Sequence, residues 1–149
     1  MLDSLGHWQD AWKYLQQIGL TYVLTAVIGW DREKEAHSAG VRTFPIVGMA
    51  SCGYLLVLGT QPDAAAQSRV LQGLITGVGF VGGGAILKEG ATVRGTATAA
   101  SIWNAGVIGA SVAIGHIEIA IILAALNLFT LRALLPVKQW IDRKSDRKA

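Results

Sequence analysis

The chain has 149 residues, of which 52% are hydrophobic and only 15% are charged, and its formal net charge is +3. Its apolar segments leave no room for a separate soluble domain, which excludes most water-soluble chemistry. The net charge gives no indication of a nucleic-acid partner, and the single cysteine, Cys52, excludes an internal disulfide and a cysteine-based metal site.

Four apolar segments follow one another along the chain, and the last is long enough for two helices. They are Trp12–Trp30, Phe44–Leu58, Val70–Leu87 and Thr96–Val137, the last interrupted by a Gly115-His116 pair. A membrane-spanning helix needs about 20 mostly apolar residues. The sequence therefore predicts an all-α integral membrane protein with about five transmembrane helices in the lipid bilayer. We expect a transmembrane domain over residues 1–137 and a basic cytoplasmic tail over 138–149.

Lysine and arginine residues are distributed unevenly between the two sides of these helices. About ten lie after the first and third spans and in the tail, against two, Lys13 and Arg69, on the other side. The positive-inside rule then places the N-terminus outside and the C-terminus in the cytoplasm. Trp12, Trp30 and Trp140 fall near the predicted interfaces, where aromatic residues gather.

The third apolar segment contains a glycine-rich motif. Its sequence, from Gly77 to Gly82, matches the G-x-G-x-x-G pattern of dinucleotide-binding proteins. That pattern requires a preceding strand and an acidic residue about 20 positions further on. Here a predicted membrane span surrounds the motif, and no acidic residue stands at that distance. Glycines spaced four apart instead favour helix packing in a membrane, and two such pairs are present, Gly73 with Gly77 and Gly79 with Gly83.

Charged residues gather in the two loops predicted on the cytoplasmic side. They are Arg32, Glu33 and Arg42 after the first span, and Lys88 and Arg94 after the third. One interpretation is that these are ordinary solvated loops. The other is a fixed charge cluster at the membrane surface, in which arginine pairs bidentately with Glu33 or with an anionic ligand.

Polar side chains enter the bilayer at the start of the fourth span. Arg94, Thr98, Ser101 and Asn104 are spaced four, three and three apart, which places them on one stripe of a helix. Such groups often bond only to their own helix or to a neighbour. If the stripe faces one side, it lines a polar notch that runs in from the cytoplasm. We find no metal motif, no nucleophile–base pair and no paired carboxylates, so we expect neither a cofactor nor an enzyme.

Three stretches, taken in this order and spacing, resemble the MgtC/SapB family of bacterial inner-membrane proteins. They are Arg32–Lys34 with Ala39–Thr43, then Gly77–Ile86, then Val93–Ala100 with Trp103. The resemblance implies a compact multi-pass domain of the bacterial inner membrane with the charged motifs on the cytoplasmic side. It also implies a link to magnesium limitation and to survival inside macrophages, and a role in regulating other membrane machines, including the ATP synthase. Many members continue into a soluble domain, and we expect this chain to hold the transmembrane domain only.

Two classes of function remain open from the sequence. The first is a regulator that docks its glycine faces against another membrane complex or against its own copy, for which a homodimer is expected. The second is a small transporter or channel for a cation or small anion that uses the polar notch, with Arg32 and Glu33 at its mouth. The absence of acidic residues in the middle of spans two to four argues against magnesium conduction.

Overall fold

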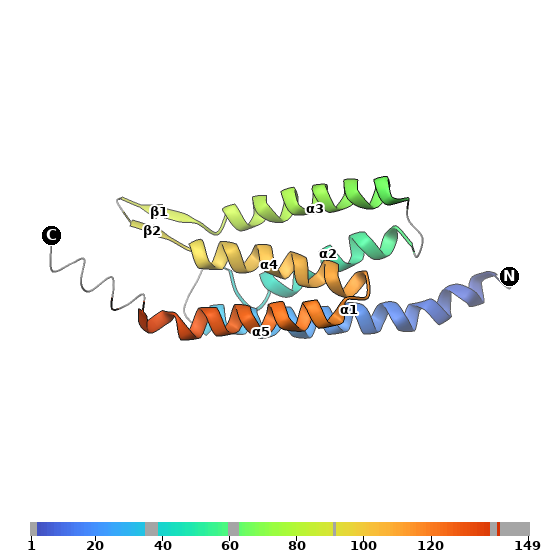
Figure 1. The fold of residues 1–149 in the computed structure, drawn as a ribbon, viewed down its shortest axis with the longest axis horizontal. Helices are drawn as coiled ribbons and strands as arrows, with labels where there is room; N and C mark the ends of the chain where they lie inside the picture. Colours follow the sequence, from blue (N-terminus) through green and yellow to red (C-terminus); the bar gives the residue numbers. More distant parts are fainter. Residues whose placement is uncertain (1–2, 35–38, 60–62, 91, 138–139, 141–149) are drawn as a thin grey trace.

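A computed structural model of the chain describes residues 3–34, 39–59, 63–90, 92–137 and 140. Within these residues it forms five helices and one short hairpin. The helices are α1 (Asp3–Lys34), α2 (Thr43–Val57), α3 (Ala64–Gly83), α4 (Thr96–Ala113) and α5 (Ile117–Ala133). They lie along one common direction, and the connections between them fall at the two ends of the bundle (Figure 1). The predicted all-α class is thus confirmed, and the predicted basic tail lies outside the described residues apart from Trp140.

The hairpin corrects the prediction of a plain loop after the third span. Strands β1 (Leu87–Glu89) and β2 (Thr92–Arg94) pair antiparallel, with Lys88 opposite Val93. Gly90 takes a positive φ of 61°, which a tight turn needs and which other residues rarely adopt. We call the end of the bundle that carries this hairpin, together with the ends of α1 and α5, the hairpin end (Figure 1).

Helices α1 and α3 begin earlier than the apolar segments indicate. Helix α1 has 32 residues, or about 48 Å at 1.5 Å per residue, which exceeds the roughly 30 Å of a bilayer core. Its first turns extend beyond the other helices, and Trp8 and Trp12 there are exposed (Figure 1). Helix α3 begins at Ala64 because the carboxylate of Asp63 caps it, accepting from the Ala65 N–H at 3.3 Å.

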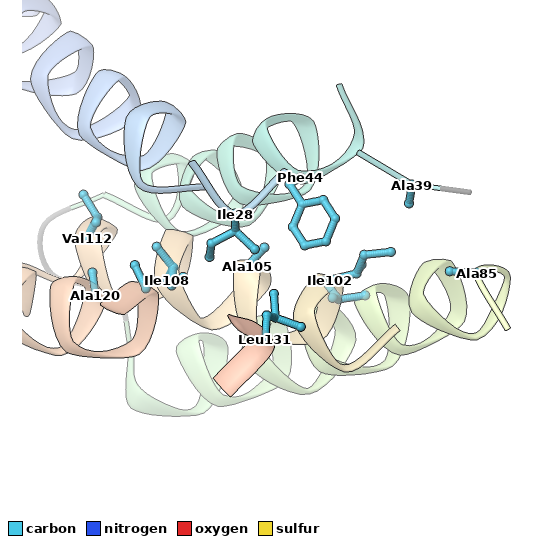
Figure 2. Close-up of a cluster of buried hydrophobic side chains, with 12 residues drawn as sticks. Ile28, Ala39, Phe44, Ala85, Ile102, Ala105, Ile108, Val112, Ala120 and Leu131 are labelled. Carbon is cyan, nitrogen blue, oxygen red and sulfur yellow. The ribbon is translucent and has the colours of Figure 1, made fainter. Parts of the chain in front are cut away.

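Helix α4 is the centre of the bundle and packs against each of the other four helices. Its buried apolar side chains meet Ile28 of α1 and Phe44 of α2, both fully buried (Figure 2). The α4 residues in this core are Ile102, Ala105, Ile108 and Val112. Apolar side chains are also numerous on the outside, where Val57 of α2 and Phe80 of α3 are almost fully exposed.

Among the described residues, one helical segment is both long and apolar enough to meet the criterion for a membrane span. It is Ile117–Val137, while Thr43–Val57 is apolar but shorter. The remaining helices carry more polar side chains, such as Gln17, Thr21 and Thr25 on α1. The five-span arrangement and its orientation therefore stay predictions.

Close packing between these helices depends on glycines other than the four predicted. A Cβ added to Gly109 of α4 would collide with the carbonyl oxygen of Gly48 on α2, so these two backbones touch. By contrast, a Cβ at any of the predicted glycines would meet no atom within 4 Å; they are Gly73, Gly77, Gly79 and Gly83. They make no close contact within the part of the chain that the structure describes, and their role in packing against another chain stays a prediction.

Candidate functional site

A buried carboxylate joins α1 to α5 at the hairpin end. Asp31 accepts hydrogen bonds from two guanidinium groups, from Arg32 at 2.9 Å through Oδ2 and from Arg132 at 2.8 Å through Oδ1. The side chains of Asp31 and Arg32 are 9% and 3% exposed, whereas that of Arg132 is 66% exposed. The bridge therefore has a buried half on α1 and an open half on α5.

The electrostatics of Asp31 follow from this arrangement. Asp31 lies just beyond the predicted first span, and its burial alone would raise the pKa of the carboxyl group. The hydrogen bonds and positive charges of Arg32 and Arg132 outweigh that burial and hold the pKa below its ordinary value of 3.8. Asp31 is thus ionised at neutral pH and fixes the ends of two helices together.

A cavity of about 350 Å³ lies next to this bridge, at the start of α4. Its polar lining residues are Arg32, Arg94, Thr96, Thr98 and Thr130. Gly95 precedes the helix with a φ of 84°, and a Cβ there would collide with the carbonyl oxygen of Ala85. Because Gly95 has no side chain, the first turn of α4 has no side-chain cap. The first N–H groups of the helix have no intrahelical partners, so this end can receive an acceptor.

Thr98 is the unusual member of the cavity wall. Its side chain is 1% exposed, and its Oγ1 has no hydrogen-bond partner among the described residues. A hydroxyl buried without a partner costs about 1–3 kcal/mol. A threonine in a helix commonly bonds to the carbonyl four residues back, as Thr25 does to Thr21 at 2.7 Å. Thr98 is too close to the start of α4 for a helical carbonyl to lie four residues behind it.

The other two members of the predicted polar stripe lie in a second cavity. It has a volume of about 300 Å³ and shares Ala97, Thr130 and Leu131 with the first. Ser101 donates to the Asn127 side-chain oxygen at 2.9 Å, and Asn104 donates to the Leu123 carbonyl at 3.3 Å. The predicted stripe therefore divides into two pairs. Ser101 and Asn104 bond to α5, whereas Arg94 and Thr98, nearer the hairpin end, line the cavity beside Arg32.

The remaining predicted site residues lie outside both cavities. Glu33 accepts a hydrogen bond from the Val41 N–H at 3.0 Å, which ties the end of α1 to the segment before α2. Arg42 is exposed at the N-cap of α2, and Lys88 is exposed on β1. The structure thus brings Arg32, Arg94 and Thr98 together and places Glu33, Arg42 and Lys88 elsewhere on the hairpin end.

Sequence reasoning missed the importance of Asp31 and Arg132. The signal was present, because Arg132 is the one lysine or arginine within the last apolar segment, Thr96–Val137, and such a group usually has a partner. From the sequence, Arg132 lies close enough to the predicted cytoplasmic end of its span to extend its charged group to the interface. In the structure it does reach outward, but its Nε also bonds to Asp31.

An apolar groove lies on another side of the bundle, between α2 and α3. Its volume is about 480 Å³, and two of the predicted packing glycines, Gly73 and Gly77, line it together with Val47, Tyr54 and Val81. Among the described residues, no group of three or more histidine, cysteine, aspartate or glutamate side chains is arranged to hold a metal ion.

Comparison with known proteins places these features in a family. The sequence model of the MgtC family matches residues 18–140. The chain is 32% identical over 139 residues to an uncharacterized protein of Haemophilus influenzae, covering 87% of this chain and 58% of that protein. It is 30% identical over 128 residues to Protein MgtC of Brucella abortus, covering 85% of this chain and 53% of the relative.

A third relative is matched over more of its own length. Protein SrpB of Synechococcus elongatus is 31% identical over 144 residues, covering 86% of this chain and 79% of that protein. The chain thus spans a little over half the length of the Haemophilus and Brucella relatives. No solved structure matches the chain.

Proposed function

The chain belongs to the MgtC family, and we propose that it is a multi-pass protein of the bacterial inner membrane that regulates another membrane protein by helix docking. The proposal includes five membrane-spanning helices and a link to magnesium limitation or intracellular survival. The ATP synthase, suggested by the family resemblance, is the first candidate partner. The observation that carries the proposal is the apolar groove between α2 and α3, where Gly73 and Gly77 are open.

The groove has the properties that helix association in lipid requires. Packing in a bilayer depends on close approach of small residues, because lipid is as apolar as the helices themselves. Gly77 leaves open space at the middle of α3, and Gly73 lies one turn away on the same face. Tyr54 of α2, 64% exposed, lines the other wall and adds an aromatic contact surface. A transmembrane helix of a partner is the occupant that suits such a groove.

The structure gives less support to the transport alternative. Polar side chains between α4 and α5 extend from the hairpin end as far as Asn104 and Asn127. Beyond that depth the described helices meet through buried Ile108, Val112 and Ala120. These three side chains offer an ion no polar partner, and burying a charge without one is costly. The polar contact at this end of the bundle comes from α1, where the Gln17 side chain donates to the Val112 carbonyl at 3.0 Å.

The test combines photo-crosslinking with glycine replacement in the bacterial membrane. A photo-reactive amino acid at Tyr54, inside the groove, should form one discrete adduct with a second membrane protein, and Gly77→Leu should abolish it. A probe at Tyr22 of α1, which is 48% exposed and outside the groove, is the control position. Gly53→Leu is the control substitution, since Gly53 of α2 also has open space around it and does not line the groove.

The identity of the adduct decides between the versions of the proposal. A heterologous membrane protein supports the regulator, and an adduct with a second copy of the chain supports the homodimer as the working form. Equal adducts from Tyr54 in the wild type and in Gly77→Leu would show that the groove is not the docking face.

A further inference from the structure

We propose that the cavity at the start of α4 binds a phosphate group, carried either by a phospholipid headgroup or by free inorganic phosphate. The cavity lies at the hairpin end, away from the α2–α3 groove, and it shares no lining residue with that groove. The inference is therefore independent of the docking proposal, and the two can fail separately.

The backbone supplies the first part of the site. The N-terminus of an α-helix presents unpaired N–H groups and a partial positive charge, which together favour an anion. Helix α4 has 18 residues, begins at the cavity and has no side-chain cap from Gly95.

Thr98 is an independent indication that something polar is missing from the cavity. Thr98 lines the cavity, and its buried hydroxyl has no partner among the described residues, so it has one unused donor. Buried polar groups are nearly always hydrogen-bonded. A phosphate oxygen bound at the start of α4 would accept from this hydroxyl as well as from the backbone.

The charges near the cavity have the sign that an anion requires. Arg32 and Arg94 line it, and no carboxylate is among the described lining residues. The nearby carboxylate of Asp31 accepts hydrogen bonds from both Arg32 and Arg132. Arginine suits phosphate because its planar fork can donate two parallel hydrogen bonds. A divalent cation would find the wrong charge and no oxygen anion.

The cavity also has apolar lining residues that suit a phosphate ester. They are Val93 of β2, Leu131 of α5, and Leu134 and Leu135 just after that helix. If the bundle spans the membrane as proposed above, this apolar surface can contact the glycerol and first methylenes of a lipid.

Two substitutions test the site, each with a matched control. Thr98→Val removes the hydroxyl and keeps the shape, and Thr76→Val is its control, because Thr76 of α3 lies outside the cavity. Arg94→Gln removes an exposed charge, and Arg42→Gln removes an exposed arginine from the same end of the bundle. Thr98→Ser retains the hydroxyl and should retain binding. Because Arg94 is exposed, its variant folds even if the Thr98 variant does not.

The full chain is measured in two arms. In neutral detergent, the thermal transition is recorded with increasing inorganic phosphate at constant ionic strength. In nanodiscs, lipid retention is recorded by native mass spectrometry with phosphatidylglycerol in a phosphatidylcholine background. We expect Thr98→Val and Arg94→Gln each to lower the affinity by roughly tenfold or more, as the loss of a hydrogen bond to a charged group does. The controls should change it by less than about twofold.

The arms separate the two sources of phosphate. Stabilisation by inorganic phosphate that both variants lose assigns the site to the free anion. Selective retention of phosphatidylglycerol that both variants lose, without an effect of inorganic phosphate, assigns it to a lipid headgroup. Absence of both effects in the wild type, or equal losses in the variants and their controls, would overturn the proposal.

Discussion

Replacing Asp31 with asparagine should destabilise the hairpin end far more than removing its partner Arg132. The two carboxylate oxygens of Asp31 each accept from a different guanidinium, Oδ2 from Arg32 and Oδ1 from Arg132. The amide of asparagine keeps one acceptor oxygen and puts a donor in place of the other. One of the two arginines therefore loses a hydrogen-bond acceptor, and the negative charge beside the buried Arg32 is removed.

The burial of each partner sets the size of these effects. Arg32 is 3% exposed, so removing its carboxylate leaves a buried charge poorly compensated, and we expect Asp31→Asn to lower the free energy of unfolding by about 2–3 kcal/mol. The Arg132 side chain is 66% exposed, and solvent screening limits its pair to below about 1 kcal/mol. Arg132→Gln should therefore cost less than about half of the Asp31→Asn effect.

Both variants can be measured by unfolding the full chain with dodecyl sulfate in mixed micelles, followed by tryptophan fluorescence. A double variant supplies the coupling between the two positions. Equal costs for Asp31→Asn and Arg132→Gln, or a cost below about 1 kcal/mol for the first, would show that the buried Asp31–Arg32 pair does not stabilise the hairpin end.

The same measurement has a pH dependence with a defined sign. Because the pKa of Asp31 is lowered below 3.8 in the folded chain, its stabilisation is fully present above pH 3.8. It is lost as the pH falls through the lower folded pKa. Asp31→Asn should lose less stability between pH 5 and the acid limit of the assay than the wild type does, and parallel curves would contradict the assignment.

Two further predictions concern packing and polar contacts in the bundle. Gly109→Ala should lower the free energy of unfolding by about 1–3 kcal/mol, because the added Cβ meets the Gly48 carbonyl. Gly77→Ala should be neutral or stabilise the chain by up to about 1 kcal/mol, because its Cβ would enter open space. Thermal unfolding of both variants tests this, and a similar cost for both would contradict it. Ser101→Ala should lower the free energy of unfolding by about 1–3 kcal/mol, because it removes the donor to Asn127. Adding Asn127→Leu should recover most of that loss, and a double variant less stable than Ser101→Ala would contradict the prediction.

The apolar segments predicted most of the helices, because a helix that is buried in lipid or in protein needs a long run of apolar residues. The positions of α2, α4 and α5 agree with the predicted segments to within a few residues at most ends. The start of α1 could not be predicted in this way, since its first turns carry polar residues and depend on helix propensity alone. The hairpin was missed because strands of three residues are too short to show an alternating pattern.

The packing glycines show a second limit of sequence reasoning. Spacing of four residues identified Gly73 and Gly77 as one face of a helix, which is correct, but spacing does not say what that face meets. In the structure the face is open, and the contact between α2 and α4 is made by Gly48 and Gly109, which lie 61 positions apart and share no local pattern. Such a contact depends on which helices are neighbours in the bundle, and the residue pattern of a single sequence does not reveal this.

Two residues of the polar stripe on α4, Thr98 and Ser101, look alike in the sequence but have different surroundings in the structure. Thr98 and Ser101 are both small hydroxyl residues, both buried and one turn apart, so the sequence gives them the same interpretation. The difference lies on α5, where Ser101 meets Asn127 while Thr98 faces a cavity beside Arg32 and Arg94. A satisfied hydroxyl needs nothing further, whereas an unsatisfied one next to a helix N-terminus and two arginines defines the ligand that would complete it. The oxyanion site is therefore inferred from the donors that the chain itself leaves unused, and that inference required the position of α5.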